Sequence, residues 1–282
     1  MWLWMSVCSA LLLGVYDVAK KQALKKNGVY WILVSATGIT AVLLSPFLSS
    51  GSLADHLSLV IKAVLVSSSW VSGLVALQCL PLTTVSTIKA SRPMFVVIFS
   101  ILLFGERLNA LQWLGVALVM AALLLSSRSG RHDTDRRTSA KGMACMIISV
   151  LTGSASALYD KYILQHLEPM FVQSWTNIYI TVLLALVLLV RYLTDREHFV
   201  GFRWDWRIPL IAVLITVSDA LYFYSVKDPD ALLSVISMIR RSSVVITFLF
   251  GALMFKEGHI KDKAVDLSLM MIGIGLLLFG SM

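Results

Sequence analysis

The sequence is poor in the residues that most often build disulfides, metal sites and catalytic centres. Its 282 residues include only three cysteines, Cys8, Cys79 and Cys145, and each stands alone in an apolar stretch. Single cysteines of this kind are typical of small buried side chains. The five histidines lie in or beside predicted loops, and neither an H-E-x-x-H motif nor a phosphate-binding loop occurs. We therefore expect no metal ion, no cofactor, no direct use of ATP and no enzymatic activity.

Charged residues are scarce as well. They make up 14% of the chain, whereas a typical soluble protein has about 25%. Hydrophobic residues make up 58%, and the mean hydropathy is +0.82. The apolar runs are continuous and not alternating, which argues against a transmembrane β-barrel. This composition predicts an all-α integral membrane protein.

Hydrophobic runs of membrane-spanning length predict about ten transmembrane helices. Residues 1–18 lack a basic region at their start, so we expect a retained first helix and not a signal peptide. The predicted spans are Leu3–Ala19, Val29–Leu48, Leu57–Leu77, Thr84–Phe104, Leu108–Ser127, Gly142–Ile163, Met170–Tyr192, Ile208–Val226, Ala231–Phe255 and Ala264–Ser281.

The two halves of the sequence resemble each other. At an offset of about 151 positions, a cation meets a cation (Lys89 and Arg240) and Glu106 meets Glu257. At an offset of about 143 positions, the Tyr-Asp pair ending at Asp17 meets the pair ending at Asp160. These matches predict a duplicated five-helix unit, with repeats at 1–127 and 142–282 and a basic loop at 128–141. Because each unit has an odd number of spans, the copies must be inverted across the membrane, as in many secondary transporters.

The distribution of lysine and arginine predicts the orientation in the membrane. Most of them follow odd-numbered spans, as in Lys20, Lys21 and the 128–141 loop. The positive-inside rule then puts these loops in the cytoplasm and both termini outside, in a bacterial inner membrane. The net charge of +8 is explained by these loops, and we expect no nucleic-acid partner.

Ionisable residues inside the predicted spans are the candidate site. Arg92 lies about 12 Å along its span, and Lys89, one turn earlier, shares its helix face. A charge at this depth is costly unless it faces a bundle interior or a wet cavity. We therefore predict that Lys89, Arg92 and Arg240 face a cavity and bind solute. Asp219 either tunes these cations in the cavity or pairs with an arginine of the ninth span to lock two helices together.

Five further residues are candidates with an alternative structural interpretation. Tyr222 and Trp70 are predicted to line the cavity, although aromatic residues in spans often pack or anchor at the interface. Asp17 and Asp160 are candidates for gating or coupling, or else pair with neighbouring lysines at the membrane interface. Arg241 points about 100° away from its neighbour on an ideal helix, which favours a structural pairing over a gating role.

The chain resembles the EamA family of the drug/metabolite transporter superfamily. The likeness rests on the five-plus-five plan and on the end of each half: a span with a mid-helix proline, Pro93, followed by FGERLNALQWLGVALVMAALLL, with FKEGHIKDKAVDLSLMMIGIGLLLF as the second copy. By its physics alone, the turn at 105–107 is only a link between helices. The resemblance implies a secondary carrier that works by alternating access. The basic loop after the first span departs from the family pattern and suggests a flipped orientation, and the extra cations favour an anionic solute.

The sequence therefore predicts a secondary active transporter for a small anionic or zwitterionic metabolite. The alternative is a flippase for a lipid-linked headgroup, which needs a lateral opening between helices. The expected partners are the solute and the lipid bilayer, and the oligomeric state, monomer or homodimer, stays open. The identity of the solute, the coupling ion and the direction of transport do not follow from the residues.

Overall fold

The computed structural model describes residues 1–24, 27–80, 85, 88–89, 91–128, 140–194, 201–243 and 260–281. Within these ranges the chain forms α-helices joined by short links, and no strand occurs. The helices are α1 (Trp2–Ala23), α2 (Val29–Leu44), the 3-10 turn η1 (Ser45–Phe47), α3 (Leu53–Cys79), α5 (Arg92–Phe104), α6 (Ala110–Arg128), α7 (Ala140–Leu164), α8 (Pro169–Thr194), α9 (Arg207–Lys227), α10 (Leu233–Arg241) and α12 (Ile260–Gly280).

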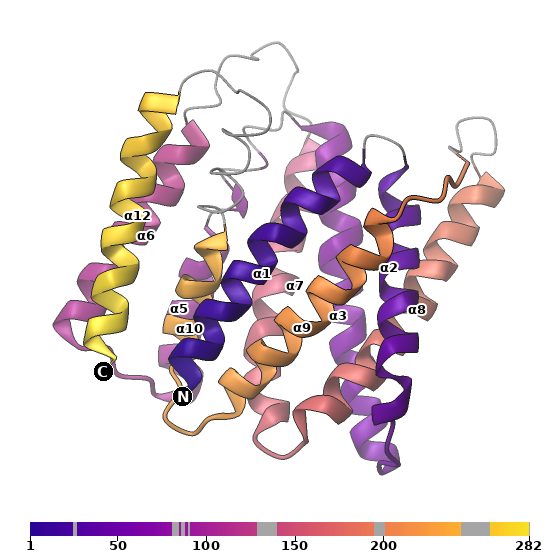
Figure 1. Cartoon of the computed structure of the whole chain (residues 1–282), viewed down its shortest axis with the longest axis horizontal. Coiled ribbons are helices and arrows are strands. Elements are labelled where there is room, and N and C mark those ends of the chain that lie inside the picture. Colours follow the sequence, from indigo (N-terminus) through magenta and orange to yellow (C-terminus); the bar gives the residue numbers. More distant parts are fainter. Residues whose placement is uncertain are drawn as a thin grey trace.

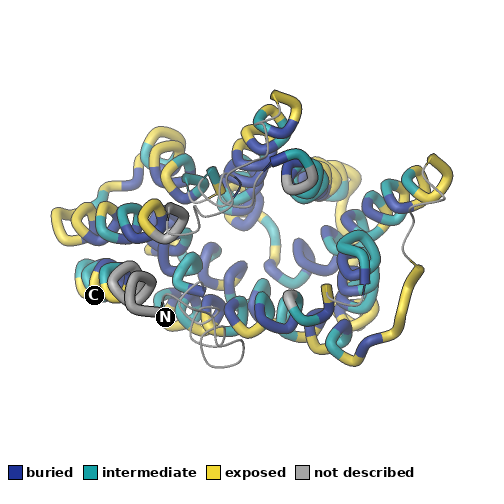
Figure 2. The backbone as a smooth tube through the Cα atoms, turned by 90° about the horizontal axis from the view of Figure 1, so that it is seen from above, coloured by how far each residue is buried: buried dark blue, intermediate teal, exposed yellow. Residues whose placement is uncertain are grey.

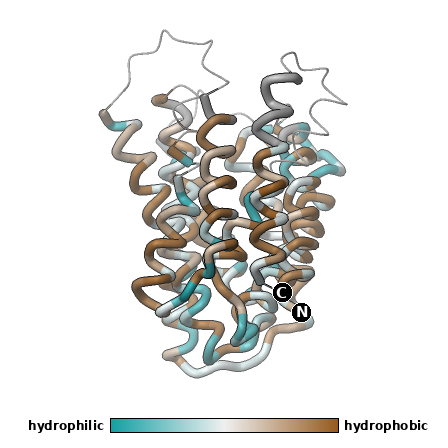
Figure 3. The backbone as a smooth tube through the Cα atoms, turned by 90° about the vertical axis from the view of Figure 1, so that its left-hand side faces the viewer, coloured by the Kyte–Doolittle hydropathy of each residue, from teal (hydrophilic) through white to brown (hydrophobic). Residues whose placement is uncertain are grey.

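The protein is a multi-pass membrane protein by the length and hydropathy of its helices. Six of the described segments are long and apolar enough to cross a membrane: α1, α2 with η1, α3, α7, α8 and α9. Helices α5, α6 and α12 contain shorter apolar stretches. A described helix overlaps each of the ten predicted ranges, while the count of ten membrane crossings stays a prediction. Figure 3 shows hydrophobic positions along most of the helix length.

The proline of the predicted fourth span does not lie in mid-helix. The described helix α5 begins at Arg92, so Pro93 occupies its first turn. Proline is well tolerated there because the first backbone N–H groups of a helix have no partner within it. The first part of the predicted span, residues 84–90, lies largely outside the described residues.

The helices stand side by side around a central region, with the two halves interleaved. In Figure 1 the N-terminal end of α1 lies at the bottom, near the C-terminus, whereas α7 begins at the top. The first helices of the two halves, α1 and α7, therefore run in opposite directions, as expected for an inverted repeat. Seen from above in Figure 2, buried positions face the inside of the bundle and exposed positions gather on its outside.

The helix contacts repeat themselves when the halves are exchanged. Helix α1 packs on α9, and α3 packs on α7. Because α1 and α7 match in sequence, and α3 and α9 are each the third long helix of their half, these two contacts are one contact made twice. The pairs α2–α8, α5–α10 and α6–α12 are also in contact, and each of them maps onto itself. This pattern is what a two-fold relation between the halves produces.

Buried serines form the same pair of reciprocal hydrogen bonds at the α1–α9 contact and at the α3–α7 contact. Between α1 and α9, Ser9 Oγ donates to the carbonyl oxygen of Ser218 at 2.8 Å, and Ser218 Oγ donates back to that of Ser9 at 2.9 Å. Between α3 and α7, Ser69 and Ser149 make the same reciprocal bonds at 2.8 and 2.6 Å. Small side chains let helix backbones approach closely, and hydrogen bonds then join them.

Glycines hold α6 against α12 in a similarly reciprocal way. A Cβ atom on Gly115 would lie 2.8 Å from the carbonyl oxygen of Gly273, and one on Gly273 would lie 3.0 Å from that of Gly115. These distances leave no room for a side chain at either position.

A large apolar cluster joins both halves and reaches the end of the bundle where α3 begins and α7 finishes. It includes Leu59 of α3, Leu164 of α7, Val172 of α8, and Leu233 and Ile236 of α10, all almost completely buried. This end of the bundle is consequently well packed.

Candidate functional site

A cavity of about 490 Å³ lies between the two halves. Its wall is formed by residues of α1, α2, α3, α5, α7, α8, α9 and α10, together with Leu24 and Lys89. A volume of this size is in the range of small-molecule sites, about 300–1,000 Å³. The cavity is thus large enough to hold a small metabolite inside the helical bundle.

The structure brings most of the predicted site residues into this wall. All six residues predicted to bind solute line it: Lys89, Arg92, Arg240, Asp219, Tyr222 and Trp70. Of the three gating candidates, Asp160 and Arg241 line it, whereas Asp17 does not. Their roles in transport stay predictions.

Arg240 of α10 forms an ion pair with Asp219 of α9. Its guanidinium carbon also lies 4.2 Å above the centre of the Tyr222 ring, a favourable cation–π distance. The sequence offered two alternatives for Asp219, a position in the cavity and an ion pair that joins two helices. The structure combines them, because the pair joins α9 to α10 and is part of the cavity wall. The Arg240 Nε atom is buried and makes no hydrogen bond within the described part of the chain.

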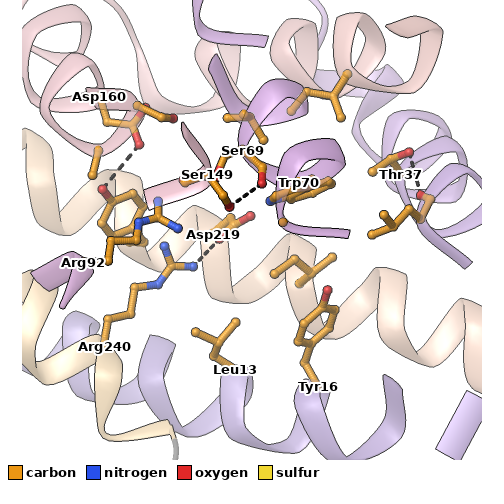
Figure 4. A pocket seen from close by; sticks show the side chains of 18 of the residues that line it. Leu13, Tyr16, Thr37, Ser69, Trp70, Arg92, Ser149, Asp160, Asp219 and Arg240 are labelled. Carbon is orange, nitrogen blue, oxygen red and sulfur yellow. Dashed lines mark hydrogen bonds and ion pairs between the residues drawn. The ribbon is translucent and has the colours of Figure 1, made fainter. Parts of the chain in front are cut away.

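Arg92 reaches the cavity from the first turn of α5 and is held there by α7. Its guanidinium donates to the carbonyl oxygen of Gly153. A Cβ atom at position 153 would lie 2.7 Å from Arg92 Cζ and 2.7 Å from Ser69 Oγ, so the glycine makes room for the arginine. Figure 4 shows Arg92 and Arg240 entering the same side of the cavity, with Trp70 across from them.

A second ion pair closes the deep end of the cavity. Lys62 of α3 pairs with Asp160 of α7, and both residues are buried, with 2% and 6% of their surface exposed. Tyr222 Oη donates to the other oxygen of this carboxylate at 3.3 Å. The Lys62 ammonium lies 4.2 Å above the Phe223 ring centre. Each charge is thereby compensated inside the bundle, as a buried charge requires.

This arrangement corrects the expected surroundings of Asp160. Its partner is Lys62, from the other half of the chain, and not its sequence neighbour Lys161, whose ammonium contacts Glu106 at 2.7 Å. Lys62 was not among the residues predicted to line the cavity. Its position well inside an apolar helix that begins at Leu53 was the signal that could have identified it.

Glu106 also does more than terminate a link between helices. Helix α5 ends at Phe104, and Gly105 has a φ of 65°, the left-handed conformation that commonly ends a helix. This turn directs the buried Glu106 carboxylate to the start of α10, where it accepts hydrogen bonds from the backbone N–H groups of Leu233 at 2.6 Å and Ser234 at 3.1 Å. A carboxylate there satisfies free donors and the positive end of the helix. The first half thus caps a helix of the second.

The cavity is accessible from the end where α1 finishes. Lining residues Leu24 and Lys89 are exposed there, whereas Lys62, Asp160 and Tyr222 at the opposite end are buried. Lys20 also lies near this mouth, where its ammonium contacts the Tyr16 hydroxyl at 3.2 Å.

Asp17 stands behind the mouth, outside the cavity wall. Its carboxylate interacts electrostatically with Lys20, Arg241 and Lys89. The pairing expected for Arg241 with a carboxylate at ion-pair distance is absent among the described residues.

Uncharged polar residues of α8 complete the wall and were missed. Thr176 and Asn177 both line the cavity, and Thr176 Oγ1 is buried without a hydrogen-bond partner in the described structure. Their signal in the sequence is a polar group near the beginning of an otherwise apolar helix.

Comparison with known proteins agrees with this architecture. A model of the EamA-like transporter family matches residues 1–128 and, a second time, residues 140–279. A solved crystal structure superposes with a TM-score of 0.75 at 13% sequence identity, over 98% of each chain, which supports the fold alone. No curated protein matches the sequence. Because both copies of the family pattern together span nearly the whole chain, the protein belongs to the EamA-like transporter family.

Proposed function

We propose that the protein is a secondary active carrier that moves a small anionic or zwitterionic metabolite by alternating access. The observation that carries this proposal is the cavity described above, which is built by both repeats, is accessible from one end of the bundle and has mostly basic residues among its charged lining residues. A site at the interface of two inverted repeats is the plan of many secondary transporters.

The six wall residues predicted from the sequence have distinct parts in this proposal. Lys89, Arg92 and Arg240 bind the negative group of the solute. Asp219 holds Arg240 when the cavity is empty and releases it when the solute supplies a better-placed anion. Trp70 and Tyr222 pack against the body of the solute.

Asp17 and Asp160 are proposed as equivalent gate residues of the two repeats. They occupy matching positions on α1 and α7, which run in opposite directions. Asp160 is buried in its pair with Lys62 at the closed end, whereas Asp17 is only half-buried near the mouth. Exchange of the two environments would close the mouth and open the other end. Arg241 interacts electrostatically with Asp17 and would couple this exchange to the site.

The remaining parts of the proposal concern the repeats and the membrane. Five-helix units at 1–127 and 142–282, joined by the basic segment 128–141, would form the inverted pair. With odd-numbered loops in the cytoplasm of a bacterium and both termini outside, the described mouth faces the cytoplasm. One chain supplies every residue of the described wall, so the site is complete in a monomer and in a homodimer.

Transport in proteoliposomes tests the proposal. Vesicles containing the wild-type protein are loaded with a pool of metabolites and assayed for counterflow, and the Arg92→Ala and Arg240→Ala variants are compared with it. We expect both variants to lose most of the transport. Lys227→Ala is a matched control, because it removes a cation from an exposed pair with Glu168 outside the cavity. Wild-type transport by both arginine variants would refute the site, and movement of a lipid-linked headgroup instead would favour the flippase alternative.

A further inference from the structure

The described cavity wall has a large excess of positive charge. Six basic side chains line it, and only two carboxylates do, Asp160 and Asp219. The basic residues are Lys20, Lys62, Lys89, Arg92, Arg240 and Arg241. The excess is therefore four positive charges, in a part of the molecule where an uncompensated charge is costly.

The two ion pairs divide these cations into groups. Asp160 compensates Lys62, and Asp219 compensates Arg240. Lys20 and Lys89 lie at the mouth, where Lys89 is exposed to water, and Asp17 behind the mouth interacts electrostatically with both of them and with Arg241. The charges of these four residues are thus offset by a carboxylate or by solvent.

Arg92 and Arg241 remain without an ion-pair partner in the described structure, although Arg241 also interacts with Asp17 at longer range. They come from different repeats, both are half-buried, and their charges act on each other. Arg92 has a backbone carbonyl as its described partner, and Arg241 has no carboxylate at ion-pair distance among the described residues. Two arginines that repel each other inside a cavity are best compensated by two negative charges placed between them.

We propose that the solute is a compact organic dianion whose two negative charges are bound by Arg92 and Arg241. Arg240 contributes its Nε, a donor without a partner in the described structure, and Thr176 offers a hydroxyl from α8. A dicarboxylate and a phosphate monoester share this chemistry. A monoanion or a zwitterion would leave at least one of these arginines without an anion in contact with it, and a neutral solute would leave both without one. This inference rests on the proposed carrier function and narrows its substrate class.

Paired probes that differ by one charge at nearly constant size test the inference. Thermal stabilisation and calorimetric binding are measured on the full-length protein in nanodiscs at pH 8, where a phosphate monoester carries close to two charges. One pair is succinate and its monoamide, and the other is phenyl phosphate and its methyl ester. We expect each dianion to bind at least about tenfold more tightly than its partner, since losing one buried charge contact costs at least that much.

Arginine variants connect the preference to the proposed residues. In Arg92→Gln and in Arg241→Gln, the ratio of dianion to monoanion affinity should fall towards one, while Lys227→Gln outside the cavity should keep it. The pair that binds more tightly in the wild type tells a carboxylate ligand from a phosphate ligand. No binding of either dianion, equal binding of both members of each pair, or an unchanged ratio in both arginine variants would overturn the inference.

Failure of this inference is distinguishable from failure of the carrier proposal. If counterflow moves a monoanion or a zwitterion and the dianions bind no better, the dianion assignment is wrong and the carrier function stands. If no member of the metabolite pool is moved while dianions bind with the expected ratio, the site is a dianion site and the carrier proposal is wrong.

Discussion

Breaking the buried ion pair between Lys62 and Asp160 gives the sharpest test of how the closed end of the cavity is held. Asp160→Asn keeps the shape of the side chain and removes its negative charge. Lys62 is then left as a buried cation, with the Phe223 ring as its remaining described contact. The matched change Lys62→Met removes the cation and keeps a long, flexible side chain.

Each single change leaves one buried charge without its partner, whereas the double change removes both charges. Removing one partner of a buried ion pair typically costs about 3–5 kcal/mol, because an uncompensated charge stays in the interior. Replacing both partners by apolar or neutral groups is often close to neutral. We therefore expect each single variant to lower the unfolding temperature by on the order of 10 °C, and the Lys62→Met/Asp160→Asn double variant to recover most of that loss.

Thermal unfolding in nanodiscs, followed by intrinsic fluorescence, measures the three variants against the wild type. The coupling energy of the double-mutant cycle should amount to several kcal/mol. Additive losses, with no recovery in the double variant, would refute the reasoning that the two charges depend on each other. If the pair is also the gate proposed above, the stable double variant should still transport more slowly than the wild type.

Three further changes follow from close contacts in the structure. Gly153→Ala places a Cβ atom 2.7 Å from Arg92 Cζ and should reduce counterflow about tenfold with little change in unfolding temperature. Glu106→Ala leaves the first N–H groups of α10 without their acceptor and should destabilise the protein by about 1–3 kcal/mol in thermal unfolding; a smaller loss in Glu106→Gln would show that hydrogen bonding matters more than charge. Gly115→Val clashes with α12 and should cost about 1–3 kcal/mol, whereas Gly275→Ala, with open space around it, is the control and should cost nothing.

The helical fold and much of the cavity wall could be predicted from the sequence. Apolar runs give the helices because backbone groups in a bilayer must be satisfied within each segment. Lys89, Arg92 and Arg240 could be assigned to an interior because a charge facing lipid is too costly. These are properties of single segments, and they do not depend on how the helices pack.

Partner choices could not be predicted, because they depend on which helices meet. Asp160 had a lysine beside it in the sequence, yet its partner is Lys62, on a helix of the other repeat. Glu106 looked like part of a turn until α10 was seen to begin at its carboxylate. Asp219 had two possible arginine partners one residue apart, and only the rotation of α10 selects Arg240.

The capping of α10 by Glu106 has a consequence for how the chain becomes a protein. A second half made alone would lack the acceptor for the first amide groups of that helix, and a first half made alone would leave the Glu106 carboxylate without its partners. Split at the junction between repeats, the fragments should be short-lived apart and persist only when produced together. If the two halves arose by duplication, a contact of this kind between them would have made each copy dependent on the other for a stable fold. The two copies would then have been retained together in one chain.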